Sequence, residues 1–324
     1  MIPPLPRTRQ VTIRAMKIAM MGSGGVGGFF GGRLAHAGYD VSFVARGAHL
    51  AAMRERGLVI ESDVHGDIRI PTVHATDDPA SLGTVDLVIL SVKLWDTEAA
   101  ILQLKPLLGP GTGVLSLQNG VIKDDILRRE LGDAPVMGGV CYVGTTLLRP
   151  GVILQTGAMQ RVALGEYDGR PSERARFLHE ALLKSGVTSE LSSDVRRAIW
   201  EKYVFLVGLS ATTASMRTSI GPIRKNPRTR AFLLEIMREA VAVGRAQGIA
   251  LPADYADACL ARADGLPDDM AASMAHDLQR GNRLELEWLS GGVAQLGAAT
   301  GVPTPANRAV WDILALYAEG GKPA

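Results

Sequence analysis

A glycine-rich turn near the start of the chain restricts the fold more than any other feature of the sequence. Residues 17–21 form a short apolar run, and the sequence GSGGVG follows it directly. The first glycine of such a turn allows a sharp bend, the second lets backbone N–H groups approach a pyrophosphate, and the third lets the next helix pack against the strand. The pattern predicts a dinucleotide site, with a helix from Gly28 to Ala37 whose N-terminus faces the anion. The expected cofactor contacts are Gly22, Ser23, Gly24, Gly25, Val26 and Gly27.

The end of the next strand indicates which dinucleotide the chain binds. Residues 40–45 are apolar on both faces, as expected of a strand covered by helices on both sides, and Arg46 follows them. An acidic residue near this point takes the ribose 2′-hydroxyl of NAD, whereas an arginine accepts the 2′-phosphate of NADP. Arg46 therefore predicts NADP, and its alternative interpretation is a solvated cation at a strand end.

Strands and helices continue to alternate after this point, which is typical of a parallel sheet with right-handed crossovers. We expect strands at 85–92, 114–118 and 135–140, and helices at 95–104 and 123–131. Ligands bind beyond the carboxyl ends of such strands. This places Lys93 and Asn119 at the mouth of the site, although an asparagine before Gly120 is also a common turn former.

The pattern changes after residue 141 and again after residue 191. Short alternating runs between 142 and 165 predict an antiparallel extension of the sheet, followed by a helix at 172–185 and a last strand at 187–191. The sequence Ser192-Ser193-Asp194 is typical of a helix N-cap, and no convincing strand follows it. We therefore expect a dinucleotide-binding domain at 16–191 and a helical domain at 192–324. Residues 1–15 are expected to be a disordered leader, or to lie upstream of a functional start at Met16.

A lysine lies on an apolar stripe of the first helix in the second domain. Helical spacing places Lys202 on one face with Val195, Ile199, Leu206 and Ser210. Desolvation lowers the pKa of a buried lysine toward the range that is useful for proton transfer. Lys202 is therefore a candidate general acid, and the alternative is a lysine whose charged end reaches water.

Composition and charge exclude several classes of protein. The 324 residues carry 35 Lys and Arg against 33 Asp and Glu, a net charge of +2 that is too even for a nucleic-acid-binding face. Cys141 and Cys259 lie in apolar surroundings, which favours reduced thiols in a cytoplasmic protein over a disulfide. The histidines and cysteines lack metal-ligand spacing, so no metal is expected. The longest charge-free run, residues 288–307, is broken by glycines and prolines and predicts no membrane span.

Two further acidic residues are candidates for the site. A helix is expected at 269–277, and after an interruption at 280–282 the chain continues through Glu285 and Glu287. Because these two glutamates are two positions apart, they point to different faces. Periodicity leaves open which of them faces a cleft.

Together these motifs resemble the ketopantoate reductase (2-dehydropantoate 2-reductase) family from Met16 almost to the C-terminus. Their order and spacing carry the resemblance, more than any single motif does. Besides the glycine turn and Arg46, the matching pieces are Ser91-Val92-Lys93, Gln118-Asn119-Gly120, Trp200-Glu201-Lys202, Ser273-Met274, Glu285 and Pro303-Thr304-Pro305-Ala306-Asn307.

The resemblance implies an α/β fold: an N-terminal Rossmann-type doubly wound sheet, an all-helical C-terminal domain and an active cleft between them. It implies hydride transfer from NADPH to the carbonyl carbon of a 2-oxo acid, and we expect a homodimer. Lys202 would protonate the developing alkoxide, and Glu285 would bind the hydroxyl end of the substrate and help to place the lysine. Asn119 would hold substrate and nicotinamide in register, Ser273 would contact the substrate, and Lys93 would lie beside the cofactor.

The sequence departs from the family pattern beyond the lysine. Asparagines often stand four and eight residues after it, where this chain has Leu206 and Ser210. Because hydrogen-bonding sites discriminate strongly, the loss of two amides favours a different, more apolar substrate as an alternative, with Ser210 as the remaining polar contact. A non-catalytic NADP-binding sensor is a further alternative. Retention of both Lys202 and Glu285 argues against it, because a sensor needs neither.

Overall fold

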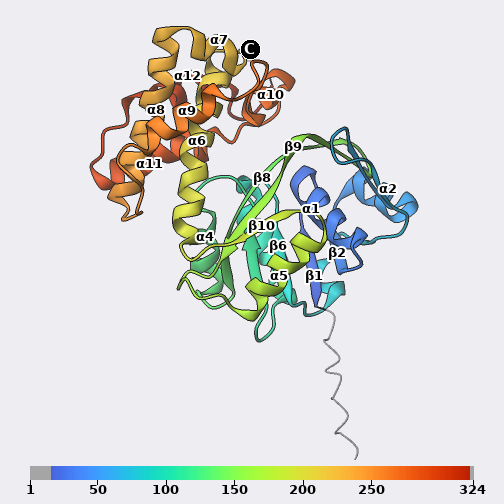
Figure 1. The fold of residues 1–324 in the computed structure, drawn as a ribbon. Helices are drawn as coiled ribbons and strands as arrows, with labels where there is room; N and C mark the ends of the chain where they lie inside the picture. Colours follow the sequence, from blue (N-terminus) through green and yellow to red (C-terminus); the bar gives the residue numbers. More distant parts are fainter. Residues whose placement is uncertain (1–15, 322–324) are drawn as a thin grey trace, which may run out of the picture.

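Ten strands form one sheet in the computed structural model, which describes residues 16–321 (Figure 1). The predicted leader, residues 1–15, lies outside the described residues. The strand order is β4-β3-β9-β8-β7-β6-β1-β2-β5, and β10 pairs with β9. Five neighbouring strands at one side are all parallel: β7 (Gly113–Ser116), β6 (Leu87–Leu90), β1 (Lys17–Met21), β2 (Asp40–Val44) and β5 (His74–Thr76).

Helices cover both faces of these parallel strands, which confirms the predicted doubly wound class. On β1, Ile18 and Met20 pack with α1 (Gly25–His36) and α5 (Glu173–Lys184). The alternate residues Ala19 and Met21 pack with α3 (Thr97–Leu104) and α4 (Lys123–Leu131) on the opposite face. Because both faces are buried, the strands read as continuous apolar runs such as Leu87–Leu90.

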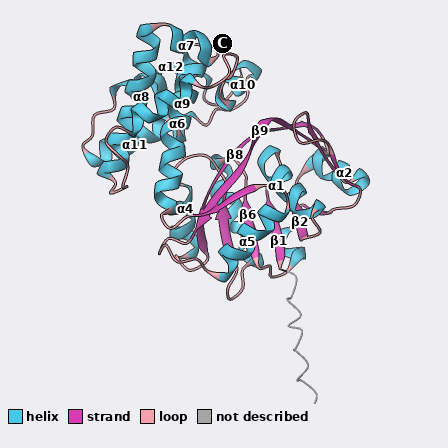
Figure 2. Cartoon of the chain, in the orientation of Figure 1, coloured by secondary structure: helices cyan, strands magenta, loops and turns pink. Residues whose placement is uncertain are grey.

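The predicted antiparallel extension is a single long hairpin (Figure 2). The sequence suggested a strand at 135–140 and then short runs, but β8 (Val136–Arg149) continues for 14 residues and pairs with β9 (Val152–Gly165). One end of β8 is parallel to β7, so a single strand belongs both to the parallel sheet and to the hairpin. The other edge of β9 pairs first with β3 (Leu58–Ser62) and then with β10 (Thr188–Leu191).

Several elements differ from the sequence expectations. Helix α1 begins at Gly25, three residues earlier than predicted, because the Gly28 N–H already donates to the Gly24 carbonyl at 2.7 Å. The helix expected from residue 95 starts with a 3-10 turn, Leu94–Asp96. Between residues 47 and 84 no element is predicted, and the structure has α2 (Gly47–Arg56), β3, β4 (Ile68–Ile70), β5 and the 3-10 turn Pro79–Leu82.

Residues 192–321 contain helices and no strand, as predicted. The Asp194 carboxylate accepts a hydrogen bond from the Arg197 N–H at 3.0 Å and caps α6. The helix expected at 269–277 is shifted to α10, and the segment around Glu285 is a 3-10 turn, Leu286–Trp288. Within residues 16–321, no helix is both long and apolar enough to cross a membrane. The helices are α6 (Val195–Ser215), α7 (Ile220–Lys225), α8 (Pro227–Ala246), α9 (Tyr255–Asp264), α10 (Ser273–Arg280), α11 (Ser290–Thr300) and α12 (Pro305–Leu314).

Helix α6 runs from the sheet into the helical region (Figure 1) and belongs to two hydrophobic cores. Its first two turns place Val195 and Ile199 against Val140 and Ala163 of the hairpin. A Cβ atom on Gly138 of β8 would lie 2.5 Å from a Val195 methyl group, so glycine is needed for this close approach. From Trp200 onward the same helix packs inside the helical region. Lys202 therefore lies where the sheet meets the helices.

A buried carboxylate holds the N-terminus of α12. Glu239 on α8 accepts hydrogen bonds from the backbone N–H groups of Ala306 and Asn307 at 2.7 and 2.9 Å, and from the Asn307 side-chain amide at 2.7 Å. These donors belong to the first turn of a helix, where backbone N–H groups lack partners within the helix. The Pro-Ala-Asn motif near the C-terminus therefore has a structural role.

We predict that Glu239→Ala lowers the free energy of unfolding by about 2 to 4 kcal/mol, because three buried donors lose their acceptor. Urea denaturation followed by circular dichroism measures the change. Glu235→Ala on the exposed side of the same helix is the matched control and should stay within about 0.5 kcal/mol of the parent protein. Equal losses in both variants would contradict the capping role.

Candidate active site

The geometry of the glycine turn fits a dinucleotide. Gly22 has a φ of +92°, which glycine adopts without strain. A Cβ atom on Gly27 would lie 1.9 Å from the Gly22 carbonyl oxygen, so helix and strand approach each other more closely than another residue permits. A Cβ atom on Gly24 would meet nothing within 4 Å, so this side of the turn is open. The three glycines thus show the bend, the open side and the close packing that the motif predicted.

The residues next to the turn connect it to the end of β2. The buried Ser23 hydroxyl donates to the Val44 carbonyl at 3.0 Å, which ties the turn to that strand. Arg46 follows as the N-cap residue of α2; its side chain is exposed and forms no ion pair within residues 16–321. The Ser91 hydroxyl is buried beside Gly27 without a hydrogen-bond partner among the described residues. A free guanidinium and a free hydroxyl suit a polar ligand on this turn.

Lys93 and Asn119 lie beyond the carboxyl ends of two adjacent strands, as predicted. Lys93 follows β6 and Asn119 follows β7. Both side chains contact Glu285, which belongs to the helical region. The Lys93 ammonium donates to Glu285 Oε2 at 2.9 Å, and Asn119 Nδ2 lies 3.5 Å from the same oxygen. The buried Glu285 carboxylate thus contacts two side chains of the sheet domain.

Lys202 completes this group of side chains. Its ammonium donates to Asn119 Oδ1 at 2.9 Å and lies 5.8 Å from the centre of the Tyr142 ring. Burial lowers the pKa of Lys202, and the charge of Glu285 partly opposes the shift. Among the described residues, Lys202 makes no direct hydrogen bond to Glu285. The Asn119 amide contacts both groups, and the charge of Glu285 also acts on the lysine directly. An ammonium with a lowered pKa is suited to donate a proton inside a cleft.

The structure decides between the two glutamates. Glu285 is only 5% exposed and faces Lys93 and Asn119 of the sheet domain. Glu287 is exposed, where it accepts hydrogen bonds from Gln295 and from the Trp311 indole. Glu287 therefore belongs to the packing of the helical region.

Sequence reasoning missed two residues that contact Lys93, Asp277 and Trp95, and a third, Trp288, that packs on Trp95. Asp277 on α10 lies 3.6 Å from the Lys93 ammonium, one helical turn after Ser273, a spacing that could have indicated it. Burial by itself lowers the pKa of Lys93. The negative charges and hydrogen bonds of Glu285 and Asp277 outweigh this effect, so the pKa is raised. Trp95 of the sheet domain and Trp288 of the helical region meet with ring centres 5.8 Å apart. The side chains therefore hold the two parts of the protein together where the site lies.

The remaining predicted contacts lie in different surroundings. Ser273 is exposed at the first residue of α10. Ser210 is completely buried, and its hydroxyl has no partner among the described residues. Leu206, one turn beyond Lys202, is half-buried and packs against the helical core. The roles of Ser273 and Ser210 in substrate binding stay predictions.

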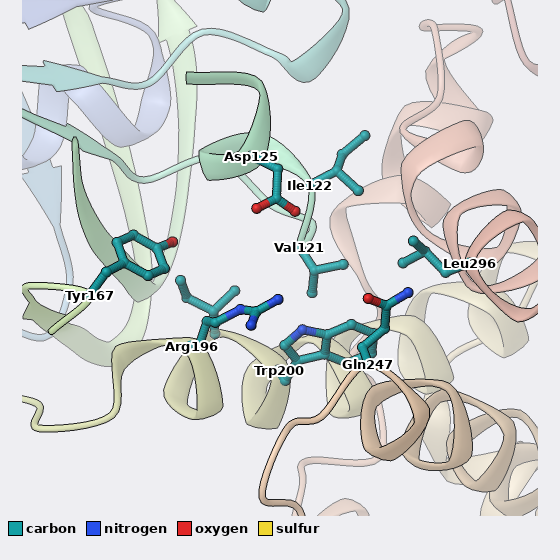
Figure 3. Close-up of a pocket in the computed structure, with 9 residues that line it drawn as sticks. Val121, Ile122, Asp125, Tyr167, Arg196, Trp200, Gln247 and Leu296 are labelled. Carbon is teal, nitrogen blue, oxygen red and sulfur yellow. The ribbon is translucent and has the colours of Figure 1, made fainter. Parts of the chain in front are cut away.

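A small hollow lies where the two parts of the protein meet (Figure 3). Figure 3 shows Tyr167, Arg196 and Trp200 on its wall. None of the predicted site residues lines it. Within residues 16–321, no three His, Cys, Asp or Glu side chains lie close enough together to hold a metal ion. The candidate site is therefore the group formed by Lys93, Asn119, Lys202 and Glu285.

Comparison with known families agrees with this geometry. Residues 18–169 match the family model described as "Ketopantoate reductase PanE/ApbA", and residues 194–318 match the model of its C-terminal part. A 2-dehydropantoate 2-reductase of Mesorhizobium japonicum is 32% identical over 91% of this chain and 95% of its own length. An enzyme of the same name from Archaeoglobus fulgidus is 30% identical over 93% of this chain and 98% of its own length.

A solved structure shows the same arrangement. The PanE/ApbA family ketopantoate reductase of Ralstonia eutropha superposes with a TM-score of 0.84 at 35% identity, covering 93% of this chain and 98% of that one. The similarity extends through both the sheet and the helices.

Proposed function

Because the chain belongs to the PanE/ApbA ketopantoate reductase family, we propose that it reduces a 2-oxo acid to a 2-hydroxy acid with NADPH. The substrate that the family favours is 2-dehydropantoate, which would give pantoate. The contact between the Lys202 ammonium and Asn119 Oδ1 at 2.9 Å carries the proposal, because it presents a half-buried proton donor at the mouth of a dinucleotide fold. The related proteins carry the names of oxidoreductases of this type.

The chain's own residues account for the proton and for the placement of the substrate. A dinucleotide held on the glycine turn would supply a hydride to the carbonyl carbon. Lys202 gives its N–H proton to the carbonyl oxygen as negative charge develops there, and the neutral amine later regains a proton from solvent. A cation at this oxygen stabilises charge that exists mainly in the transition state. Glu285 is placed to accept a hydrogen bond from a substrate hydroxyl, and Asn119 holds the lysine toward the substrate.

The non-catalytic sensor stays an alternative, but the burial of the cluster argues against it. A buried lysine and a buried carboxylate both carry a desolvation cost, and a protein that only binds cofactor gains nothing from either. The predicted homodimer and the cytoplasmic location also stay predictions.

We expect Lys202→Ala to lower kcat about a hundredfold or more, the scale of lost general acid catalysis, with little change in NADPH affinity. In the parent protein, activity should fall as pH rises through the pKa of Lys202, because only the ammonium can donate. The lowered pKa places this loss below the pH at which an ordinary lysine titrates. Steady-state kinetics and fluorescence titration with NADPH separate the two effects.

Lys184→Ala, which removes an exposed lysine from α5, is the matched control for this experiment. It should leave both kcat and the NADPH affinity unchanged. Turnover of the Lys202→Ala variant near that of the parent protein would rule out the proposed mechanism.

The choice of NADPH rests on Arg46. Its exposed guanidinium at the end of β2 has no acidic partner in the described part of the chain and is free to meet a 2′-phosphate. We predict that Arg46→Asp weakens NADPH binding and erodes or inverts the preference over NADH. Arg69→Asp on β4 makes the same charge change on an exposed residue away from the turn and should leave the preference intact. Equal affinities for NADPH and NADH in the parent protein would contradict the assignment.

A more apolar substrate is the second candidate, because of Leu206 and Ser210. The half-buried Leu206 supplies no hydrogen bond, and the Ser210 hydroxyl is buried without a partner in residues 16–321. Each missing neutral hydrogen bond is worth about 0.5 to 1.5 kcal/mol, so two would weaken 2-dehydropantoate binding by roughly ten- to a hundredfold. On this reading, the protein turns over bulkier or more apolar 2-oxo acids better.

We predict that the double change Leu206→Asn with Ser210→Asn lowers the KM for 2-dehydropantoate. Assays at the nicotinamide absorbance with a panel of 2-oxo acids measure the shift, and each single variant shows which amide matters. A low-micromolar KM in the parent protein that the double change does not improve would show that other residues replace the amides.

A further inference from the structure

His49 connects the glycine turn to a distant part of the chain. This residue of α2 is 9% exposed, and both ring nitrogens contact backbone groups. Nε2 lies 2.8 Å from the Ser23 carbonyl oxygen in the glycine turn, and Nδ1 lies 3.0 Å from the Gly151 nitrogen between β8 and β9. One imidazole thus joins segments that are 26 and 102 residues away from it in the sequence.

The two contacts determine the protonation state of the ring. A backbone N–H can only donate, so Nδ1 must accept from Gly151 and carries no proton. A carbonyl oxygen can only accept, so Nε2 carries the proton and donates it to Ser23. Both hydrogen bonds therefore need the neutral imidazole in its Nε2–H form. An imidazolium would point a second N–H at the Gly151 N–H and lose that bond.

The contact with Ser23 also orients the next peptide group. The chain has no cis peptide bond in residues 16–321, so the Ser23 carbonyl and the Gly24 N–H point in opposite directions. Because His49 holds the carbonyl on one side, the Gly24 N–H faces the other side. No acceptor for this N–H is found among the described residues, and a Cβ atom on Gly24 would meet nothing within 4 Å. Backbone N–H groups of this kind cradle phosphates.

We propose that His49 is a positioning residue of the cofactor site, which in its neutral form holds the Ser23 carbonyl and so aims the Gly24 N–H at the cofactor pyrophosphate. This inference rests on the proposed function, because it needs a dinucleotide on the glycine turn. It adds a residue outside the glycine motif to the binding site. It also couples that site to the β8–β9 hairpin through Gly151.

The surroundings of His49 favour its neutral form. Burial lowers the pKa of His49 below its ordinary value of 6.5, and the hydrogen bond to Ser23 only partly opposes the shift. The glycine turn carries no charged side chain. The charged residues nearest in sequence to the contacts are Arg46 on α2 and Arg149 at the end of β8, and neither hydrogen-bonds the ring. Arg149 pairs instead with Glu61 of β3 at 2.6 Å. Cofactor affinity should therefore fall as pH drops through the pKa of His49.

The test is the dissociation constant of NADPH for the full chain, measured by fluorescence titration between pH 5 and 8. His49→Gln keeps one donor and one acceptor but cannot titrate. Relative to this variant, the parent protein should lose NADPH affinity as pH falls, and the comparison cancels the titration of the cofactor's own phosphate. His49→Ala should weaken NADPH about tenfold at neutral pH, the scale of a lost hydrogen bond, and raise its KM without changing kcat.

His179→Gln is the matched control, since His179 also makes one hydrogen bond, to the Ser189 hydroxyl, but lies on α5 away from the turn. It should keep the pH dependence of the parent protein. The inference is overturned if His49→Gln and the parent protein lose NADPH affinity in parallel on acidification, or if a folded His49→Ala variant binds NADPH as tightly as the parent protein. Failure of the parent protein to bind NADPH at any pH would overturn the proposed function, and this inference with it.

Discussion

The hydrogen bond between Lys202 and Asn119 is the contact on which the site depends. It joins α6 to the carboxyl end of β7 at 2.9 Å and fixes the orientation of the asparagine amide. The carbonyl end of the amide faces the ammonium, and the N–H end faces the Glu285 carboxylate at 3.5 Å. A neutral side chain thus presents the correct dipole to a cation on one side and an anion on the other. Within residues 16–321 the Lys202 ammonium forms no ion pair with Glu285, whose carboxylate is paired with Lys93, so the lysine stays available to a substrate.

The packing of α6 makes this contact possible. The first two turns belong to the core of the hairpin and the remainder to the helical core, so the helix cannot shift relative to either part without opening apolar surface to water. Lys202 lies between the two cores. The fold can therefore hold a lysine with a lowered pKa at the boundary of its two parts.

The cofactor side of the cleft depends on segments that are distant in sequence. A Cβ atom on Gly25 would lie 2.9 Å from the Thr145 carbonyl oxygen, so β8 passes directly across the start of α1. His49 holds the same turn from the side of α2. A strand and a helix thus confine a turn that its own glycines would leave flexible. Glycine permits the conformation of the turn, and the neighbouring backbone restricts it.

The features that depend on local pattern could be predicted from the amino-acid sequence alone. The glycine turn, the parallel strands, the mouth position of Lys93 and Asn119 and the apolar face around Lys202 all follow from spacing along one element. Tertiary structure decided the rest. The continuous β8, the choice of Glu285 over Glu287 and the ring of Tyr142 beside the lysine depend on what packs opposite. Periodicity tells which residues share a face of an element, but a contact across a cleft depends on two elements whose separation no local pattern encodes.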